Sequence, residues 1–223
     1  MTVVSLEQRR GLIKNAAELY QYLEQHDLLK EKLPMWWPEY GNFEVIVGAI
    51  LTQNSQWTRV EVSLQNLRTE EVLSLEGLCT ISVEKLQELI TPSGLFKSKA
   101  DYIQGLSLAI RESFGSFETF CSEVQREWLL KQKGVGPETA DSILCYACKR
   151  EEMVVDAYTA RLLQAFGYEF DTYDDLKEWC VSDLCTHVSE KSCAEVYAFF
   201  HGMIVEFVKA NSKGKKVILE GIK

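Results

Sequence analysis

Apolar residues recur at spacings of three and four along almost the whole chain, and this pattern most constrains its fold. Leu12, Ala16, Leu19 and Leu23 form one such stripe, which puts them on a single face of an α-helix. Alternation with a period of two, which marks a half-buried strand, is confined to short pieces such as residues 153–155. Pieces this short cannot pair into a sheet. The pattern therefore predicts an all-α protein.

The same periodicity, with start and stop signals, sets the expected helix bounds. Pro137 suits the first position of a helix, where its missing N–H costs nothing. Gly167 follows the last apolar residue of another helix and is expected to cap it. After the N-terminal helix, we expect helices at residues 43–54, 83–90, 98–113, 117–131, 137–148, 157–166, 172–185 and 194–210.

The charge of the chain is acidic overall but uneven. Its 223 residues are 46% hydrophobic, enough for one large domain or two small lobes. A formal net charge of −9 argues against coating nucleic acid or an anionic membrane through bulk charge. Residues 151–204 hold three basic and eleven acidic side chains, whereas residues 128–150 and 205–223 are net basic. Any contact with nucleic acid must therefore depend on local sites.

Neither a membrane segment nor a disulfide framework is expected. The longest apolar run covers residues 45–51, and a membrane-spanning helix needs about 20 residues. The N-terminus is charged by Glu7 and lacks the apolar core of a signal peptide. We therefore expect a cytoplasmic protein whose seven irregularly spaced cysteines are free thiols.

A Gly-Val-Gly turn at residues 134–136 separates two expected helices. Its two glycines allow positive φ angles and a close approach of the backbone to a ligand. Backbone N–H groups at the start of the next helix can bind an anion, for which DNA phosphate is the obvious candidate. A plain connection between two helices explains the same residues, so the turn alone leaves both interpretations open.

Asp156 follows two β-branched residues and opens a helix. An aspartate at the N-cap accepts backbone N–H bonds, which favour its ionised form. Such a carboxylate can stabilise an oxocarbenium-like cation or position an attacking water. A cap without any chemical role is the alternative, because aspartate is common at N-caps.

In combination these segments resemble a known family. The hairpin, the V-D-x-x-x-x-R segment at residues 155–161 and Gly94-Leu-Phe-Lys-Ser-Lys-Ala100 resemble the helix-hairpin-helix DNA glycosylase superfamily, the endonuclease III group. Leu51-Thr52-Gln53 resembles the helix of that group that carries a glutamine near the DNA gap. The resemblance implies two helical lobes, residues 1–35 with 150–223 and residues 36–149, with an active-site cleft between them. It also implies a hairpin at about residues 122–148 that binds the DNA backbone, and Asp156 as the catalytic carboxylate.

Departures from the family pattern narrow the expected chemistry. Bifunctional members carry a lysine where this chain has Glu138, and a carboxylate cannot form a Schiff base. The resemblance therefore implies a monofunctional enzyme that uses water, with Lys131 and Lys133 as phosphate contacts or solvated charges.

The cysteine pattern departs as well. Many members hold a [4Fe–4S] cluster with C-x6-C-x2-C-x5-C after the aspartate, whereas here no cysteine follows Cys193 and Cys180, Cys185 and Cys193 have other spacings. Cys145 and Cys148 lack identifiable partners for zinc and are expected to be buried free cysteines. No cofactor and no metal are expected.

Two tryptophan-containing segments point to one branch. Pro34-Met-Trp36-Trp37-Pro38 and Gln53-Asn54-Ser55-Gln56-Trp57 resemble the 3-methyladenine DNA glycosylase branch that lacks the cluster. The resemblance implies that Trp36, Trp37, Pro38 and Trp57 line the base pocket and that Lys209 lies near it. Electron-rich indole faces attract a cationic alkylated purine. Anchoring of the core is the alternative for the tryptophans, and His201 fits a pocket or a core equally.

The sequence thus predicts a monofunctional DNA N-glycosylase that flips alkylated purines out of double-stranded DNA and hydrolyses the N-glycosidic bond. It is expected to act at the bacterial nucleoid as a monomer without a membrane partner. Two alternatives stay open, namely a bifunctional endonuclease III-like glycosylase and AP lyase, and a non-catalytic helix-hairpin-helix DNA-binding module. The expected DNA contacts are Gln53, Gly134, Val135, Gly136 and Thr139.

Overall fold

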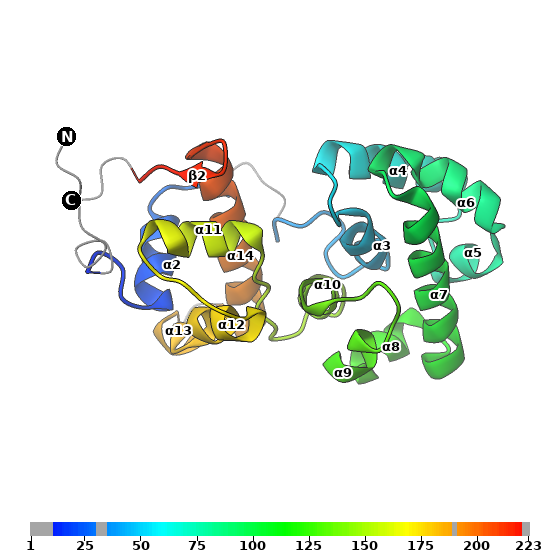
Figure 1. The fold of residues 1–223 in the computed structure, drawn as a ribbon. Helices are drawn as coiled ribbons and strands as arrows, with labels where there is room; N and C mark the ends of the chain where they lie inside the picture. The colour runs from blue at the N-terminus through cyan, green and yellow to red at the C-terminus, as the bar shows by residue number, and fades with distance from the viewer. Residues whose placement is uncertain (1–10, 30–34, 189–190, 220–223) are drawn as a thin grey trace. The chain divides into compact units, whose positions relative to one another are not determined.

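A computed structural model of the protein describes residues 11–29, 35–188 and 191–219. The chain divides into two compact units (Figure 1). The terminal unit comprises residues 1–38 and 151–223, and the central unit comprises residues 39–150. Regular structure in the described residues is almost entirely helical, so the prediction of an all-α fold is confirmed.

In the terminal unit, helix α14 (Cys193–Ala210) packs against α2 and α11. Its middle turns are buried on most sides, which explains why this stretch is apolar nearly all round. Phe200, Ile204 and Phe207 of α14 join one core cluster with Leu19 of α2 and Leu162 of α11. The other elements of this unit are α2 (Ala16–Glu24), α11 (Ala157–Ala165), α12 (Tyr173–Val181), α13 (Leu184–His187), β1 (Ser212–Lys213) and β2 (Lys216–Val217).

A small antiparallel hairpin follows α14. Ser212 pairs with Val217 and Lys213 with Lys216, and Gly214 takes a positive φ of 65° in the turn. The sequence analysis expected no paired strands here. Two strands of two residues each are too short to show an alternating pattern, so the periodicity could not reveal them.

The central unit is built around α3 (Glu44–Leu51), in which every residue from position 45 to 51 is buried. This apolar run is therefore a core helix of the unit. The longest helix of the unit, α7 (Phe96–Phe114), contacts α3, α5, α6 and α8. The remaining elements are α4 (Trp57–Thr69), α5 (Leu75–Thr80), α6 (Val83–Ile90), the 3-10 helix η1 (Thr91–Ser93), α8 (Phe117–Glu123), α9 (Arg126–Leu130), α10 (Pro137–Ser142) and the π-helix η2 (Ile143–Ala147).

Two helices expected to be continuous are each divided. The stretch 117–131 forms α8 and α9 because Val124 and Gln125 are extended, with ψ angles of 138° and 149°. The stretch 172–185 forms α12 and the start of α13, because Ser182 has a ψ of 116° and Asp183 a φ of 56°. Helices α4 and α5 were not predicted, whereas α6 has the expected bounds.

The expectation that all cysteines are free thiols is wrong for one pair. Cys185 on α13 and Cys193 at the start of α14 form a disulfide, with their Cα atoms 5.4 Å apart. The pairing depends on how the ends of α13 and α14 meet, which irregular spacing in the sequence could not indicate. The other five cysteines are free thiols; Cys145 is buried as expected, whereas Cys148 is only half-buried.

No helix within the described residues is both long and apolar enough to cross a membrane. Over the same ranges, no three His, Cys, Asp or Glu side chains gather in a way that could hold a metal ion.

Candidate active site

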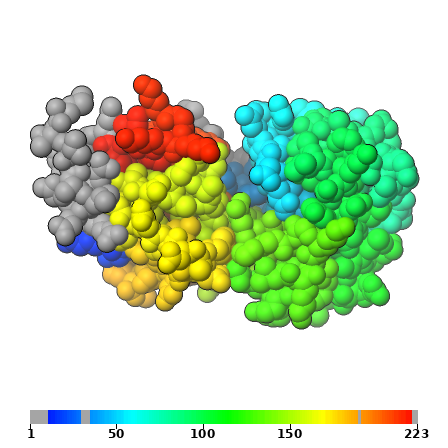
Figure 2. All heavy atoms as spheres, in the orientation of Figure 1, coloured from blue at the N-terminus to red at the C-terminus, as the bar shows by residue number. Residues whose placement is uncertain are grey.

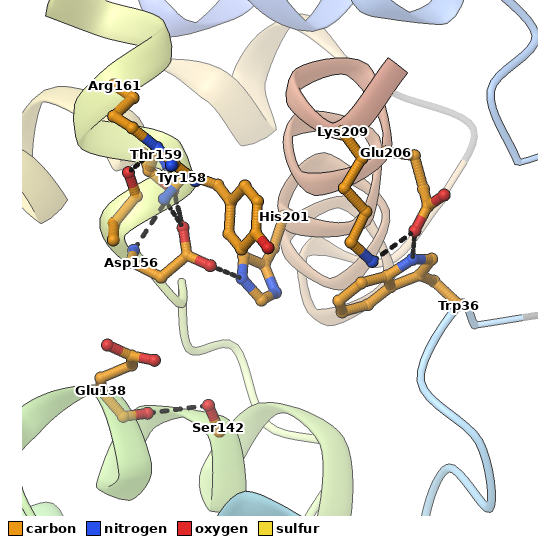
Figure 3. Close-up of polar contacts among 11 residues, drawn as sticks. Trp36, Glu138, Ser142, Asp156, Tyr158, Thr159, Arg161, His201, Glu206 and Lys209 are labelled. Atoms are coloured by element: carbon orange, nitrogen blue, oxygen red, sulfur yellow. Dashed lines mark hydrogen bonds and ion pairs between the residues drawn. The ribbon is translucent and has the colours of Figure 1, made fainter. Parts of the chain in front are cut away.

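Asp156 caps helix α11, as its sequence context predicts. Its Oδ1 atom accepts hydrogen bonds from the backbone N–H groups of Tyr158 and Thr159, both at 2.8 Å. The Thr159 hydroxyl donates to the same oxygen at 3.1 Å (Figure 3). The side chain of Asp156 is only 12% exposed. The cap therefore fixes the carboxylate in one orientation through Oδ1 and leaves Oδ2 for other partners.

The surroundings of Asp156 keep its carboxyl group ionised. Burial by itself raises the pKa of the group, but the hydrogen bond and charge of His201, with the donors of Thr159, outweigh burial and hold the pKa below its ordinary value. Donors that bind the charged form favour it. Asp156 is thus a partly buried anion at neutral pH, the state that stabilisation of a sugar cation requires.

His201 is the second polar side chain of this site. It lies on α14, is 3% exposed, and its Nε2 atom is 3.5 Å from Asp156 Oδ2. Of the two interpretations left open by the sequence, the structure places His201 beside the expected catalytic carboxylate, on a buried face. The contact joins α14 to the N-terminus of α11.

Trp36 packs directly on α14 beside His201. The ring centroids of Trp36 and His201 are 5.1 Å apart in an edge-to-face arrangement. Trp36 has a positive φ of 63°, a strained conformation for a bulky residue. A Cβ atom added at Gly202 would lie 2.7 Å from Trp36 Cγ, so this close approach requires glycine at position 202.

Glu206 is a site residue that the sequence analysis missed. Trp36 Nε1 donates to Glu206 Oε1 at 3.1 Å, and Lys209 Nζ donates to the same oxygen at 3.1 Å. The Lys209 ammonium also lies 5.9 Å from the centroid of the Trp36 ring. Figure 3 shows these three side chains together on one side of α14. An acidic residue within the otherwise apolar run of residues 202–208 was the signal available in the sequence.

The other residues expected in the pocket, Trp37, Pro38 and Trp57, differ in burial and in the unit to which they belong. Trp37 is buried, 8% exposed, with its ring edge-to-face to Trp36 at 6.0 Å, whereas Pro38 is half-buried. Pro34 lies outside the described residues. Trp57 is half-buried at the start of α4 and belongs to the central unit, so its place in a base pocket stays a prediction.

The expected hairpin is formed in the central unit. Gly136 is the N-cap of α10 and Pro137 takes its first position, as predicted. Gly134 has a φ of 80°, and an added Cβ would overlap the Tyr102 ring at 2.2 Å. Val135 is 6% exposed and anchors the turn. Glycine is thus required at position 134 both for the turn and for its packing.

Gln53 is bonded to this hairpin. Its Nε2 atom donates to the carbonyl of Gly134 at 2.8 Å and to the Thr139 hydroxyl at 3.1 Å. The structure therefore brings Gln53, Gly134 and Thr139 together as one set and shows Gln53 as a support of the turn. Its role at a DNA gap is untested and stays a prediction.

Leu95 and Lys99 of the central unit are two further candidate functional residues that the sequence analysis did not name individually. Leu95 is 64% exposed and left-handed, with a φ of 48°. Lys99 is 1% exposed, and its ammonium donates to the carbonyls of Leu51 and Ser93, both at 2.8 Å. Lys99 thus ties the end of α3, just before Gln53, to the segment that presents Leu95. Both lie in the Gly94–Ala100 segment that the sequence analysis singled out.

Comparison with known proteins identifies the family of the chain. Residues 47–180 match the model of the HhH-GPD superfamily base excision DNA repair proteins. A Methanocaldococcus jannaschii protein described as a DNA repair glycosylase is 39% identical over 181 residues, 78% of this chain and 80% of its own. The H. pylori 3-methyladenine DNA glycosylase MagIII is 39% identical in sequence. Its crystal structure, bound to 1,N6-ethenoadenine, aligns with a TM-score of 0.84 over 89% of this chain and 99% of the MagIII chain.

Endonuclease III shares the fold. A non-covalent complex of that enzyme with DNA matches 95% of this chain with a TM-score of 0.69, at 18% identity. The resemblance drawn from the sequence is confirmed. The chain belongs to the HhH-GPD superfamily of base excision DNA repair proteins and is a DNA glycosylase.

Proposed function

We propose that this DNA glycosylase removes alkylated purines of the 3-methyladenine type from double-stranded DNA and that it is monofunctional, using water as the nucleophile. The observation that carries the proposal is Asp156, a carboxylate oriented by three donors to one oxygen. A group of this kind suits a reaction in which positive charge develops on the sugar.

The chemistry follows from the charge of the substrate. A purine alkylated at N3 or N7 is cationic, and cleavage moves the bonding electron pair onto the base, which leaves as a neutral molecule. Positive charge then develops on the sugar, where Asp156 stabilises it. Water adds to the sugar carbon and gives its proton to the carboxylate through Oδ2, the oxygen that lies 3.5 Å from His201.

Trp36 and Glu206 supply the features that a pocket for a cationic base needs. An indole face attracts a cation by about 0.5–2 kcal/mol, depending on desolvation. The carboxylate of Glu206 fixes the indole through its N–H, and its negative charge balances the Lys209 ammonium, which would otherwise repel a cationic base. The name of the H. pylori relative as a 3-methyladenine DNA glycosylase supports the same substrate class.

Base flipping is expected to depend on the central unit. Exposed apolar side chains on turns can enter a base stack as wedges, and Leu95 is exposed on such a turn. The backbone of the hairpin at residues 134–136 supplies N–H groups for phosphates at the start of α10. Flipping costs least where damage has weakened the pairing of a base.

The residues argue for water rather than an enzyme amine. Glu138 occupies the position at which bifunctional relatives carry lysine, by the resemblance. Lys99 is held by two carbonyl groups and is buried, so its amine does not reach a sugar. A lyase would instead need an amine that attacks the sugar carbon.

The test is release of bases from DNA treated with a methylating agent, with chromatographic identification of the released bases. Wild-type protein is expected to release 3-methyladenine, and Asp156→Asn is expected to release none while still binding the same duplex. Absence of release by the wild type would favour the non-catalytic binding module. Covalent trapping of the wild type on DNA by borohydride would favour the lyase.

A further inference from the structure

A basic groove lies on the terminal unit, and neither Trp36 nor Glu206 is among the residues that line it. It has a volume of about 660 Å³ and is formed between α11 and the β1–β2 hairpin. In Figure 2 the C-terminal segment, coloured red, lies against the yellow segment that contains α11. The residues that line it include Arg161 and Gln164 of α11 and Lys213, Lys215, Lys216 and Val217 of the hairpin.

The charge of this groove is opposite to that of its surroundings. Four of its lining side chains, Arg161, Lys213, Lys215 and Lys216, are basic, and among the described residues no carboxylate lines it. Residues 151–204, which form most of the same unit, carry eleven acidic and three basic side chains. Grouping of cations in one groove of an otherwise acidic unit is the arrangement expected of a site for a polyanion.

The groove is held in place by the core. Val217 of β2 is 6% exposed and belongs to the core cluster of the unit, and the Ile218 N–H donates to the Asn211 carbonyl at 2.8 Å. The lysines at 213, 215 and 216 are exposed on this anchored hairpin. Their positions are therefore fixed by Val217 although their side chains are in solvent.

Arg161 is oriented as well. Its Nε atom donates to the Ala157 carbonyl at 3.1 Å, and its guanidinium lies 4.5 Å from the centroid of the Tyr158 ring. These contacts leave the terminal nitrogens of the guanidinium available for an anion and limit the rotamers that binding would have to order. Arg161 also lies on the helix that Asp156 caps, which connects the groove to the active site.

We propose that this groove binds the phosphodiester backbone of the DNA strand on one side of the lesion, as a second backbone site besides the hairpin. The proposal rests on the proposed function. Arg161 and Gln164 follow Asp156 by five and eight residues, so they lie about 8–12 Å further along the axis of α11. DNA rises about 3.4 Å per nucleotide on each strand. A strand that follows the axis of α11 would therefore place in the groove the phosphates about two to four nucleotides from the flipped base.

The experiment compares two double variants of equal charge. Lys213→Gln/Lys215→Gln removes two cations from the groove, and Lys177→Gln/Lys191→Gln removes two from elsewhere in the terminal unit. Binding to an undamaged 20-base-pair duplex is measured by fluorescence anisotropy over a range of salt concentrations. Each lost phosphate contact reduces the dependence of log K on log salt by about 0.9.

The groove variant is expected to have a salt slope smaller by about 2 and an affinity about tenfold weaker at low salt. The control variant is expected to behave as the wild type. An unchanged slope in the groove variant, or equal losses in both variants, would overturn the proposal. Thermal unfolding of both variants is measured in parallel. The groove variant is expected to match the wild type because Lys213 and Lys215 are exposed, whereas the control variant loses the ion pair between Lys177 and Glu152 and is expected to unfold at a slightly lower temperature.

Two further readouts separate the groove from the proposed function. Single-turnover release of 3-methyladenine at saturating enzyme is expected to be unchanged in the groove variant, because its lysines do not touch the base. If the wild type releases no base, the proposed function fails, yet the salt slopes on undamaged duplex still decide the groove. Inorganic phosphate is then added to the wild-type complex with undamaged duplex, at the ionic strengths of the salt series. It is expected to weaken DNA binding no more than the salt does at the same ionic strength, because the groove binds a strand and not a free anion. Stronger inhibition by phosphate would indicate a site for a free anion.

Discussion

Asp156 Oδ2 lies 3.5 Å from His201 Nε2, and the two residues come from different helices of the terminal unit. Asp156 is fixed by the first turn of α11, and His201 is fixed by its burial on α14. The carboxylate is therefore positioned from two sides, by local capping through Oδ1 and by a long-range contact through Oδ2. This division allows each contribution to be tested separately.

Asp156→Asn should almost abolish base release while the fold stays intact. Asparagine is as good an N-cap as aspartate, so the free energy of unfolding should change little. Loss of the negative charge should slow base release by at least about 100-fold. Single-turnover kinetics on methylated DNA, with thermal unfolding in parallel, measures both. Asp156→Ala is the control, because it also removes the cap and should cost about 1 kcal/mol of stability.

The stability of the protein should depend on Asp156 at acid pH. Because the pKa of Asp156 is lower in the folded protein than its ordinary value, its ionisation contributes stability that is fully present above about pH 3.9. That contribution is lost as the pH falls through the folded pKa. Acidification below about pH 4 should therefore lower the free energy of unfolding of the wild type, measured by urea denaturation, more than it lowers that of Asp156→Asn. Equal losses in the two proteins below that pH would contradict the lowered pKa.

Replacement of His201 should move the acid limit of activity. His201 is one of the groups that lower the pKa of Asp156, so His201→Leu should shift the acid limb of the pH–rate profile to higher pH. His201→Gln keeps a donor for Oδ2 and should shift that limb less. If His201 only filled space, both variants would lower stability without moving the profile.

Some parts of this site could be predicted from sequence and others could not. The cap formed by Asp156 depends on a few neighbouring residues, and so does the proline at the start of α10. Glu206 is different, because its partner Trp36 is 170 positions away and periodicity carries no information on such a contact. The role of Glu206 therefore required the packing of α14.

The same distinction applies to the fold. The bounds of α6 follow from an apolar stripe and a serine cap. The break between α8 and α9 occurs at Val124 and Gln125, where the chain has neither glycine nor proline. The break is therefore set by packing, with Val124 fully buried. The Cys185–Cys193 disulfide likewise depends on how two helices meet.

Glu206 should distinguish charged from neutral substrates. Glu206→Gln keeps an acceptor for the Trp36 indole N–H but removes the negative charge beside the ring. We expect release of cationic 3-methyladenine to fall about tenfold, the effect of roughly 1.4 kcal/mol, with a smaller effect on release of any neutral adduct such as 1,N6-ethenoadenine that the enzyme accepts. Glu206→Ala removes the acceptor too and should impair both. Equal losses on both substrates in Glu206→Gln would assign Glu206 to orientation of Trp36 alone.

Gly202 should be required for the pocket rather than for the helix. Alanine at position 202 would place its Cβ 2.7 Å from Trp36 Cγ, so the indole must move away from α14 and from Glu206. Alanine is otherwise favoured over glycine within a helix by about 1 kcal/mol, which offsets part of the strain. We therefore expect base release to fall far more than stability does. Gly105→Ala is the matched control, because glycine 105 also lies within a helix but nothing is within 4 Å of an added Cβ. Gly105→Ala should keep full activity and gain stability. A Gly202→Ala protein that keeps full activity would show that the close approach of Gly202 to Trp36 does not hold the indole in the pocket.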